Sequence, residues 1–392
     1  MERLLTAMSL RILVAPDKFK GSLTAEAAAR AMAEGIRAVL PAAEVVLRPI
    51  ADGGEGTAEI LHAALGGEWV TLSSIADPLG RPVTARYLRL NAEVAVIAMS
   101  EASGLWRLQP AEYDPLHAST LGTGQLVAEA LRRGARRLLI GLGGSATHDG
   151  GVGLAQALGY TFLDASGRPL SPEPANFGRL ARIQAPTVFP TAEIIGLCDV
   201  ANPLTGPHGA ARTYGPQKGA DAAMLEELDL ALVQLADCVV RDLHVEHRDT
   251  PGAGAAGGLG FGLLGFGRAR LQPGFATLAE LLHLEREIAA CDLVLTGEGA
   301  LDAQTLHGKG PWGVAQLARR QGKPVLAFAG RVAVDAGLAA AFARCHAITP
   351  PGMPFAAACA AAPALLQQST AQALADWAGV RLGSRATTPP AA

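Results

Sequence analysis

Short apolar runs alternate with amphipathic stretches near both ends of the chain. The amphipathic stretches have helical spacing and lie at residues 25–40, 58–65 and 312–320. The apolar runs lie at residues 11–14, 44–47, 292–295, 324–328 and 346–348. Continuous apolar strands between helices are typical of parallel strands buried on both faces. The two ends of the chain are therefore predicted to build one flavodoxin-like parallel sheet of α/β class.

The middle of the chain has a different pattern. Residues 83–90 alternate apolar and polar side chains, which is typical of a strand with one solvated face. Further strand-like runs follow at 94–98, 137–140, 160–163 and 193–197. We expect an inserted second α/β domain with a mixed sheet over residues 68–286, within a discontinuous first domain of 10–67 and 287–380. Residues 381–392 have little apolar content to bury and are predicted to form a disordered tail.

Composition is that of a large soluble protein. The chain has 392 residues, of which 49% are hydrophobic and 18% charged, and its length exceeds that of a usual single domain. The formal net charge of -3 gives no broad attraction for nucleic acid or an anionic membrane. No apolar run is long enough to span a bilayer, and the first residues lack the apolar core of a signal peptide. The cysteines have no Cys-x-x-Cys spacing, which favours free thiols and a cytoplasmic location.

Four glycine-rich segments with charged residues follow predicted strands. The longest is Gly-Leu-Gly-Gly-Ser-Ala-Thr-His-Asp-Gly-Gly at 141–151, and the others are 15–22, 51–57 and 296–302. Glycines let the backbone approach a ligand, and the helix that begins after such a turn favours an anion. Any one of them alone is as readily a structural turn. Together they predict a ligand site, because open α/β sheets bind ligands at the carboxyl ends of their strands.

Six motif blocks carry a resemblance to a known family. In order they are Asp17–Ala25, Ala51–Thr57, Gly143–Gly151, Cys198–Leu204, Gly215–Ala220, and Gly297–Asp302 through His307–Lys309. They resemble the blocks of the bacterial glycerate kinase type I family over roughly residues 10 to 380. The resemblance implies two intertwined α/β domains and ATP-dependent phosphorylation of D-glycerate, at the 2-hydroxyl in most members. The chain departs from the family pattern at Lys18 and Ala98, which leaves the substrate contacts there open.

Phosphoryl transfer to an alcohol needs a magnesium site, cations around the transferred group and a carboxylate near the attacking hydroxyl. We expect Asp199 to be the base or the group that orients the hydroxyl. The metal ligands are predicted to be Asp52, Glu55 and Glu298. Each of these acids alone is equally consistent with a capping role in a turn.

Cations are expected from the same segments. Lys309 and Lys20 are predicted to act on the transferred phosphoryl group, and the planar guanidinium of Arg212 suits the glycerate carboxylate. Lysines of this kind are by default solvated. The remaining predicted contacts with substrate or phosphate are Ser22, Gly53, Gly54, Gly144, Ser145, Thr147, Asp149, Lys218, Gly297, Asp302 and His307.

Two questions stay open at this level. The glycines of residues 252–262 either form an anion-binding nest or allow close packing of a small-residue helix.

The predicted function is ATP- and Mg²⁺-dependent phosphorylation of D-glycerate to 2-phosphoglycerate, by a protein that acts on small molecules and could form a homo-oligomer. The alternatives are a kinase for the 3-hydroxyl or another small hydroxy acid, and a regulator that binds a nucleotide or metabolite without catalysis.

Overall fold

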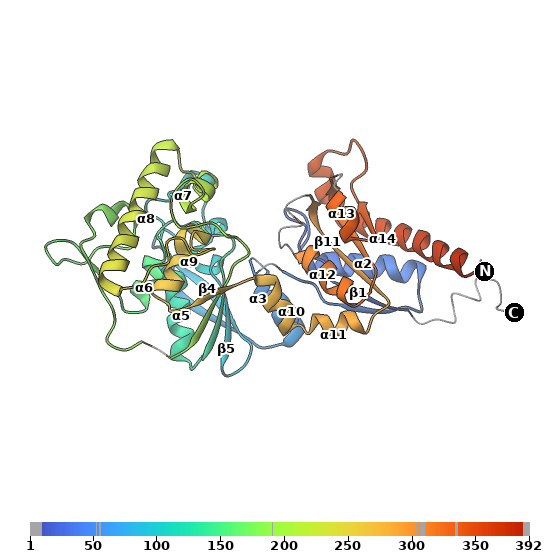
Figure 1. Ribbon diagram of the computed structural model, residues 1–392, viewed down its shortest axis with the longest axis horizontal. Helices are drawn as coiled ribbons and strands as arrows, with labels where there is room; N and C mark the ends of the chain where they lie inside the picture. The colour runs from blue at the N-terminus through green and yellow to red at the C-terminus, as the bar shows by residue number, and fades with distance from the viewer. Residues whose placement is uncertain are drawn as a thin grey trace. The chain divides into compact units, whose positions relative to one another are not determined.

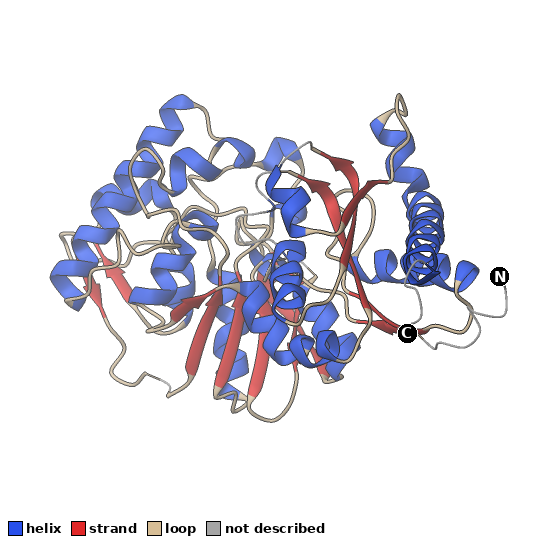
Figure 2. Ribbon diagram, turned by 45° about the vertical axis from the view of Figure 1, so that its right-hand side comes forward, coloured by secondary structure: helices blue, strands red, loops and turns tan. Residues whose placement is uncertain are grey.

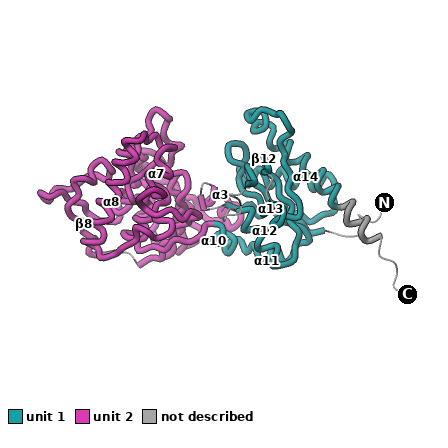
Figure 3. Tube along the Cα trace, turned by 45° about the horizontal axis from the view of Figure 1, so that its top comes forward, with its two compact units in different colours: residues 1–52, 275–392 teal, residues 53–274 magenta. Residues whose placement is uncertain are grey.

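The computed structural model describes residues 10–51, 53–54, 56–189, 191–302, 305, 310–333 and 336–386. The chain divides into two compact units (Figure 3). Unit 1 combines Met1–Asp52 with Phe275–Ala392, and unit 2 is Gly53–Gly274. Each unit is an α/β structure with its own sheet and its own hydrophobic core.

Unit 1 is built on a five-stranded sheet in the order β13-β12-β11-β1-β2, and all neighbouring pairs are parallel. The strands are β1 (Arg11–Val14), β2 (Glu44–Leu47), β11 (Leu293–Leu301), β12 (Val325–Val332) and β13 (Arg344–Ala347). Numbered within the unit, this is the order 2-1-3-4-5 of flavodoxin-like folds. The predicted α/β class with a parallel sheet is confirmed.

Helices cover both faces of this sheet (Figures 1 and 2) because its strands are apolar on both sides. Ile12 and Val14 pack under α2 (Ala25–Val39) and α14 (Phe355–Ala386), whereas Leu13 faces the opposite core. The helices of the opposite core are α10 (Gly274–Leu281), α11 (Leu284–Ala289), α12 (Gly310–Arg320) and α13 (Ala336–Ala341). Thr24 caps α2 by accepting a hydrogen bond from the N–H of Ala27 at 3.1 Å.

Helix α14 is a long helix that contains a proline. It runs from Phe355 to Ala386 through Pro363. Buried Ala362, Leu366 and Leu374 hold it on the unit, which compensates for the backbone donor that proline lacks. The helix also passes residue 381, where the tail was expected to begin, and 387–392 lie outside the described residues. Within the described ranges, none of the helices has both the length and the apolar character that crossing a membrane requires.

Unit 2 contains a six-stranded mixed sheet in the order β10-β9-β6-β5-β4-β3. The pairs β3–β4 and β4–β5 are antiparallel, and the pairs from β5 to β10 are parallel. Its strands are β3 (Glu68–Ala76), β4 (Pro82–Arg89), β5 (Val94–Ala98), β6 (Arg137–Gly141), β9 (Glu193–Leu197) and β10 (Arg270–Gln272). The predicted mixed sheet is therefore present, with β3 and β10 in addition to the predicted strands.

The predicted strand at 160–163 lies elsewhere. Strand β7 (Thr161–Leu163) pairs with β8 (Arg182–Gln184), in a separate two-stranded antiparallel sheet. This strand stays apart from the large sheet because the ring of Phe162 packs edge-on against Phe266, at 5.6 Å between ring centroids, in a second core of unit 2. The helix α8 (Ala222–Leu243) lies over this core, and Asp221 caps it by accepting from the N–H of Met224. The remaining helices of unit 2 are α3 (Thr57–Leu65), α4 (Ser100–Ser103), α5 (Leu121–Arg132), α6 (Val152–Ala157), α7 (Ala210–Tyr214), α9 (Ala255–Gly265) and the short 3₁₀ turns η1 (Leu105–Arg107), η2 (Pro110–Glu112), η3 (Pro174–Arg179) and η4 (Pro216–Lys218).

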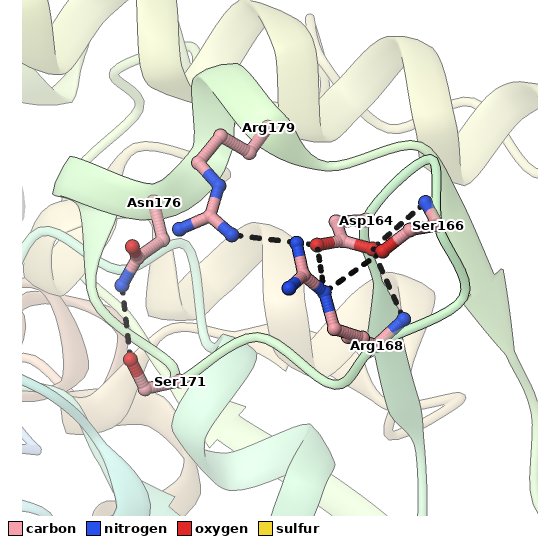
Figure 4. Close-up of polar contacts among 6 residues, drawn as sticks. All are labelled: Asp164, Ser166, Arg168, Ser171, Asn176 and Arg179. Atoms are coloured by element: carbon pink, nitrogen blue, oxygen red, sulfur yellow. Dashed lines mark hydrogen bonds and ion pairs between the residues drawn. The ribbon is translucent and has the colours of Figure 1, made fainter.

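The turn after β7 is organised by one carboxylate (Figure 4). Asp164 accepts hydrogen bonds from the backbone and the hydroxyl of Ser166 and from the backbone of Arg168, and it pairs with the guanidinium groups of Arg168 and Arg179 at 3.3 Å each. The hydroxyl of Ser166, the backbone N–H of Arg168 and the charge of Arg168 hold the pKa of Asp164 well below its usual range. Asp164 therefore fixes the loop that joins β7 to η3.

The borders of the units differ from the expected domain borders at 67/68 and 286/287. Helix α3 belongs to unit 2, because Glu59 pairs with Arg86 of β4 at 3.0 Å and His62 packs on Trp69 of β3. Helices α10 and α11 bring Phe275, Leu284 and Ile288 into the core of unit 1. The composition of the loops does not show which unit each of these helices joins, because a helix packs on whichever apolar surface its buried face matches.

Candidate active site

The carboxyl ends of β1 and β11 lie on the carboxyl edge of the unit 1 sheet, which is the side where all of its parallel strands end. These neighbouring strands mark the point where the strand order reverses, which is the usual place for a ligand in such sheets. The loop after β1 is tied to β11 by two hydrogen bonds. The N–H of Asp17 donates to the carbonyl of Gly297 at 2.8 Å, and the hydroxyl of Thr296 donates to the carbonyl of Ala15 at 2.7 Å.

Two nearly buried carboxylates lie on these segments. Glu298 of β11 is 8% exposed and accepts a hydrogen bond from the hydroxyl of Thr305 at 2.8 Å. Thr305 in turn bonds the backbone of Asp302, so Glu298 and Asp302 belong to one network. Asp17 is 6% exposed and accepts from the N–H of Lys18. Sequence reasoning did not select Asp17 as a site residue, although its position directly after β1 was the available signal.

Glycines allow the close approach of these segments. A Cβ at Gly297 would lie 2.3 Å from the carbonyl oxygen of Phe328, and one at Gly299 would lie 3.1 Å from the backbone nitrogen of Lys20. Lys20 and Ser22 are exposed at this edge, and the Ser22 hydroxyl donates to the carbonyl of Phe19. The predicted site residues Asp52, Glu55, His307 and Lys309 lie outside the described residues.

A second candidate edge lies in unit 2, at the carboxyl ends of the parallel strands β5, β6 and β9. The 142–151 loop, which follows β6, is held next to α4 by backbone hydrogen bonds. The N–H of Leu105 donates to Gly144 at 2.9 Å, and the N–H of Ala146 donates to Ser103 at 3.0 Å. This places Gly144 and Ser145 beside the segment that follows β5.

Asp149 has a structural role in this loop. It is fully buried and accepts bonds from the hydroxyls of Ser119 and Thr120 and from the N–H groups of Thr120, Gly151 and Gly153. Burial raises the pKa of Asp149, and its hydrogen bonds with Thr120 oppose this shift. Both carboxylate oxygens accept hydrogen bonds from the protein at the starts of α5 and α6, and the predicted contact of Asp149 with substrate stays a prediction.

Lys218 is buried beside the same loop, and so it is not the solvated lysine of the default interpretation. Only 1% of it is exposed. Its Nζ donates to the Ser145 hydroxyl at 2.8 Å and to the carbonyl of Thr147 at 2.7 Å. Burial lowers the pKa of Lys218 to about 7, against the opposing attraction of Asp149. Three predicted site residues, Ser145, Thr147 and Lys218, are thus in direct contact.

The glycine-rich segment 252–262 packs against this loop. It forms α9, whose start includes left-handed conformations at Ala256, Gly257 and Gly258. A Cβ at Gly257 would lie 1.9 Å from the carbonyl oxygen of Thr147, and one at Gly262 would lie 2.7 Å from the Cα of Gly151. Close packing therefore accounts for these glycines, the second of the two interpretations that the sequence left open.

Gly53 and Asp199 lie at the same edge of the sheet as the 142–151 loop. Gly53 has a φ of 83°, and a Cβ there would lie 2.7 Å from Leu197 at the end of β9. A Cβ on Gly141, at the end of β6, would lie 2.4 Å from the carbonyl oxygen of Gly53. Asp199 follows β9, and its Oδ1 accepts from the N–H of Gly274 at 2.9 Å. Gly53–Gly54, Asp199 and the 142–151 loop therefore share the carboxyl edge of the unit 2 sheet.

Comparison with known proteins identifies the family of this chain. The chain matches the model of the Glycerate kinase family over residues 12–378. It belongs to this family. A glycerate kinase of Halalkalibacterium halodurans is 45% identical over 323 residues, which are 81% of this chain and 85% of that protein. The glycerate 2-kinase of Escherichia coli K12 is 44% identical over 338 residues, or 84% of this chain and 87% of that protein. A crystal structure assigned to glycerate kinase 2 of Salmonella typhimurium LT2 has a TM-score of 0.84 at 39% identity and covers 96% of this chain and all of that one.

Within this glycerate kinase fold, Arg212 is not brought to the 142–151 loop by any contact in the described ranges. It lies on the short helix α7, is exposed and pairs with Glu226 of α8 at 3.4 Å. The neighbouring His148 is fully buried, and its Nε2 bonds the carbonyl of Ala210. Burial, together with the charge of Lys218, lowers the pKa of His148 well below its usual value. His148 therefore packs as a neutral ring.

The segment after β5 contains residues that sequence reasoning did not select. Burial raises the pKa of Glu101, and Arg86 lies 3.9 Å away and opposes the shift. Trp106 is 61% exposed, and its Nε1 donates to the carbonyl of Ser100 at 2.8 Å. The signal for both was their position directly after a parallel strand.

A metal centre made of the protein's own side chains does not occur in the described parts of the chain, where no three His, Cys, Asp or Glu residues group within ligating reach. Magnesium does not need such a group, because it keeps several water ligands and takes one or two carboxylates plus phosphate oxygens. Glu298 and Asp17 supply hard oxygen donors of the kind this ion prefers, at the unit 1 edge.

Proposed function

We propose that this protein phosphorylates D-glycerate at its 2-hydroxyl with ATP, releasing 2-phosphoglycerate and ADP. The observation that carries the proposal is the 44% identity to a glycerate 2-kinase, which extends over most of both chains. Two candidate edges with carboxylates, hydroxyls and a buried cation are consistent with phosphoryl transfer, which depends on positioning and on stabilisation of charge.

Mg²⁺ and the phosphates of ATP need oxygen ligands and cations. We assign Glu298, together with Asp52 and Glu55, to the metal, which would neutralise charge on the transferred group. Glu298 is oriented for such a role by its hydrogen bond with Thr305. Lys20 is exposed at the same edge, and Lys309 is expected to supply a second positive charge.

Asp199 is our candidate for the group that accepts or orients the 2-hydroxyl proton. The bond from the N–H of Gly274 to its Oδ1 limits the rotation of the carboxylate. A fixed carboxylate at the end of a parallel strand is suited to general-base work, provided that the hydroxyl reaches its oxygen atoms. The substrates would be small molecules, with no role for nucleic acid, and the protein would act in the cytoplasm.

Product analysis by ³¹P NMR tests this function. The full-length protein is incubated with ATP, Mg²⁺ and D-glycerate, and the spectrum separates 2-phosphoglycerate from 3-phosphoglycerate. We expect the 2-phosphate, with ADP in equal amount, and no ADP when glycerate is omitted.

Two other results would replace the proposal. A 3-phosphoglycerate product would assign the reaction to the other hydroxyl. Binding of nucleotide without any ADP release in the presence of D-glycerate, L-glycerate or related hydroxy acids would favour a regulator over an enzyme.

A further inference from the structure

A tight turn drives Lys218 into the interior of unit 2. Two glycines allow this turn. Gly219 has a φ of 92°, and a Cβ there would lie 2.8 Å from Tyr113; one at Gly215 would lie 2.3 Å from the side chain of Leu225. The N–H of Lys218 donates to the carbonyl of Gly215 at 2.9 Å. Burial of an ammonium group is costly unless the group is paired, so this lysine is placed at a cost to stability.

The ammonium group of Lys218 determines how Ser145 uses its hydroxyl. When Lys218 is protonated, its ammonium group only donates, so the Oγ of Ser145 must accept the 2.8 Å bond, and the serine proton has to be given to another acceptor. No acceptor for that proton occurs among the described residues, nor for the N–H groups of Gly144 and Ser145. Three donors therefore gather around Gly144, which is the exposed residue of this loop.

The charges around Lys218 make the site suitable for an anion. Asp149 attracts Lys218, but its oxygens are engaged by α5 and α6. His148 is buried as a neutral ring, and its Nδ1 and the Oγ1 of Thr147 have no hydrogen-bond partner in the described ranges. Further titratable residues close to the turn are Tyr113, Tyr214, Asp221 and the exposed Arg212–Glu226 pair.

We propose that the hydroxyl of Ser145 donates to an oxyanion of the ligand and that Lys218, behind it, is a positioning residue that never touches the ligand. The sequence predicts instead that Lys218 itself contacts substrate or phosphate. The identity of the oxyanion rests on the proposed function. The carboxylate of D-glycerate is one source, and a phosphate of the nucleotide has the same acceptor chemistry.

Proton uptake on binding tests the role of Lys218. At pH 8 a lysine with a pKa of about 7 is mostly neutral, and an anion bound near it raises that pKa, so binding takes up a substantial fraction of one proton. Isothermal titration calorimetry in two buffers of different ionisation enthalpy measures this uptake. D-Glycerate and ADP are titrated separately into the wild-type protein and into Lys218→Met.

Each outcome has a defined meaning. Uptake with D-glycerate that is lost in Lys218→Met identifies the carboxylate as the oxyanion, and uptake with ADP alone identifies a phosphate. No uptake with either ligand, or uptake that persists in Lys218→Met, overturns the proposal. This experiment measures binding, so it remains valid even if the wild-type protein makes no ADP from D-glycerate and the proposed function is wrong.

Steady-state kinetics test whether Lys218 acts through Ser145. We expect Ser145→Ala and Lys218→Met each to raise KM for the ligand identified by calorimetry about tenfold, with a smaller change in kcat, and the double variant to be no worse than the poorer single variant. Ser145→Thr keeps the hydroxyl and should stay close to the wild type. Lys323→Met, in the turn before β12, is the matched lysine control and should leave the kinetics unchanged.

A double variant whose KM rises by the product of the two single effects would overturn the proposal, because the two residues would then act independently. If Lys218→Met does not fold, two measurements remain decisive: proton uptake by the wild-type protein and the contrast between Ser145→Ala and Ser145→Thr.

Discussion

Removal of the Asp149 carboxylate should loosen the start of two helices at once. In Asp149→Ala, the backbone donors of Thr120, Gly151 and Gly153 lose their acceptor inside the protein. A buried donor without a partner costs about 1–3 kcal/mol. Three such donors, with partial relaxation of the loop, predict a loss of about 4–5 kcal/mol in the free energy of unfolding.

The Asp149→Asn variant should be affected less. Its amide oxygen can replace Oδ2, which accepts the bonds from Thr120 and Gly153, while its NH₂ faces the N–H of Gly151. One lost bond and one unsatisfied donor predict a loss of about 2 kcal/mol. The expected order of stability is therefore wild type, then Asn, then Ala.

Urea unfolding at pH 7 measures these losses, and amide hydrogen exchange at residues 119–121 and 149–154 reports the local effect. Asp221→Ala is the matched control, because Asp221 caps α8 at the surface through one bond to Met224. An exposed cap of this kind is worth about 1 kcal/mol. If Asp149→Ala loses no more stability than Asp221→Ala, the buried N–H groups around Asp149 do not depend on its carboxylate, and the prediction is wrong.

Three further predictions concern catalysis, pH and packing. Asp199→Asn should lower kcat about 100-fold with unchanged nucleotide affinity, since the amide keeps the shape and loses the basicity; near-normal turnover would remove Asp199 as the base. The pKa of Lys218 falls from 10.5 to about 7 on folding, so the unfolded chain binds more protons than the folded protein between these pH values. The free energy of unfolding should therefore rise with pH across this range, by up to about 5 kcal/mol. Urea unfolding at pH 7 and 9 should show a rise in stability that Lys218→Met lacks, and equal rises in both proteins would contradict the lowered pKa of Lys218. Phe266→Ala should cost about 3–5 kcal/mol in the same assay, because the ring is fully buried between Tyr160 and Phe162. Phe355→Ala, at a residue that is 79% exposed, should change stability by less than about 0.5 kcal/mol and serves as its control.

Local pattern was sufficient for the parallel sheet of unit 1. The strands β1, β2, β11 and β12 each contain a continuous apolar run, so each could be recognised without knowledge of its neighbours. Strand β3 has polar residues at several positions and a register shift between Leu72 and Ile75, and it gave no clear period. Strand β10 has three residues, which is too short for any period to appear.

The borders of the units could not be predicted because helix packing decides them. The helix α3 has apolar residues that suit either core, and only its contacts with Arg86 and Trp69 assign it to unit 2. Its position along the chain, directly after β2, predicts instead that it belongs to the first domain. The same holds for α10 and α11, whose buried side chains join the core of unit 1.

The sequence by itself determined the α/β class, the segments that carry chemistry and the family resemblance, because glycines and charges next to apolar strands are local signals. Only the tertiary structure decided what individual side chains do. Asp149 and Lys218 look alike in sequence as charged residues beside glycines, yet the fold commits the first to five backbone and hydroxyl donors and buries the second against Ser145. Burial and partners set the role of a charged group, and both come from residues that are distant along the chain.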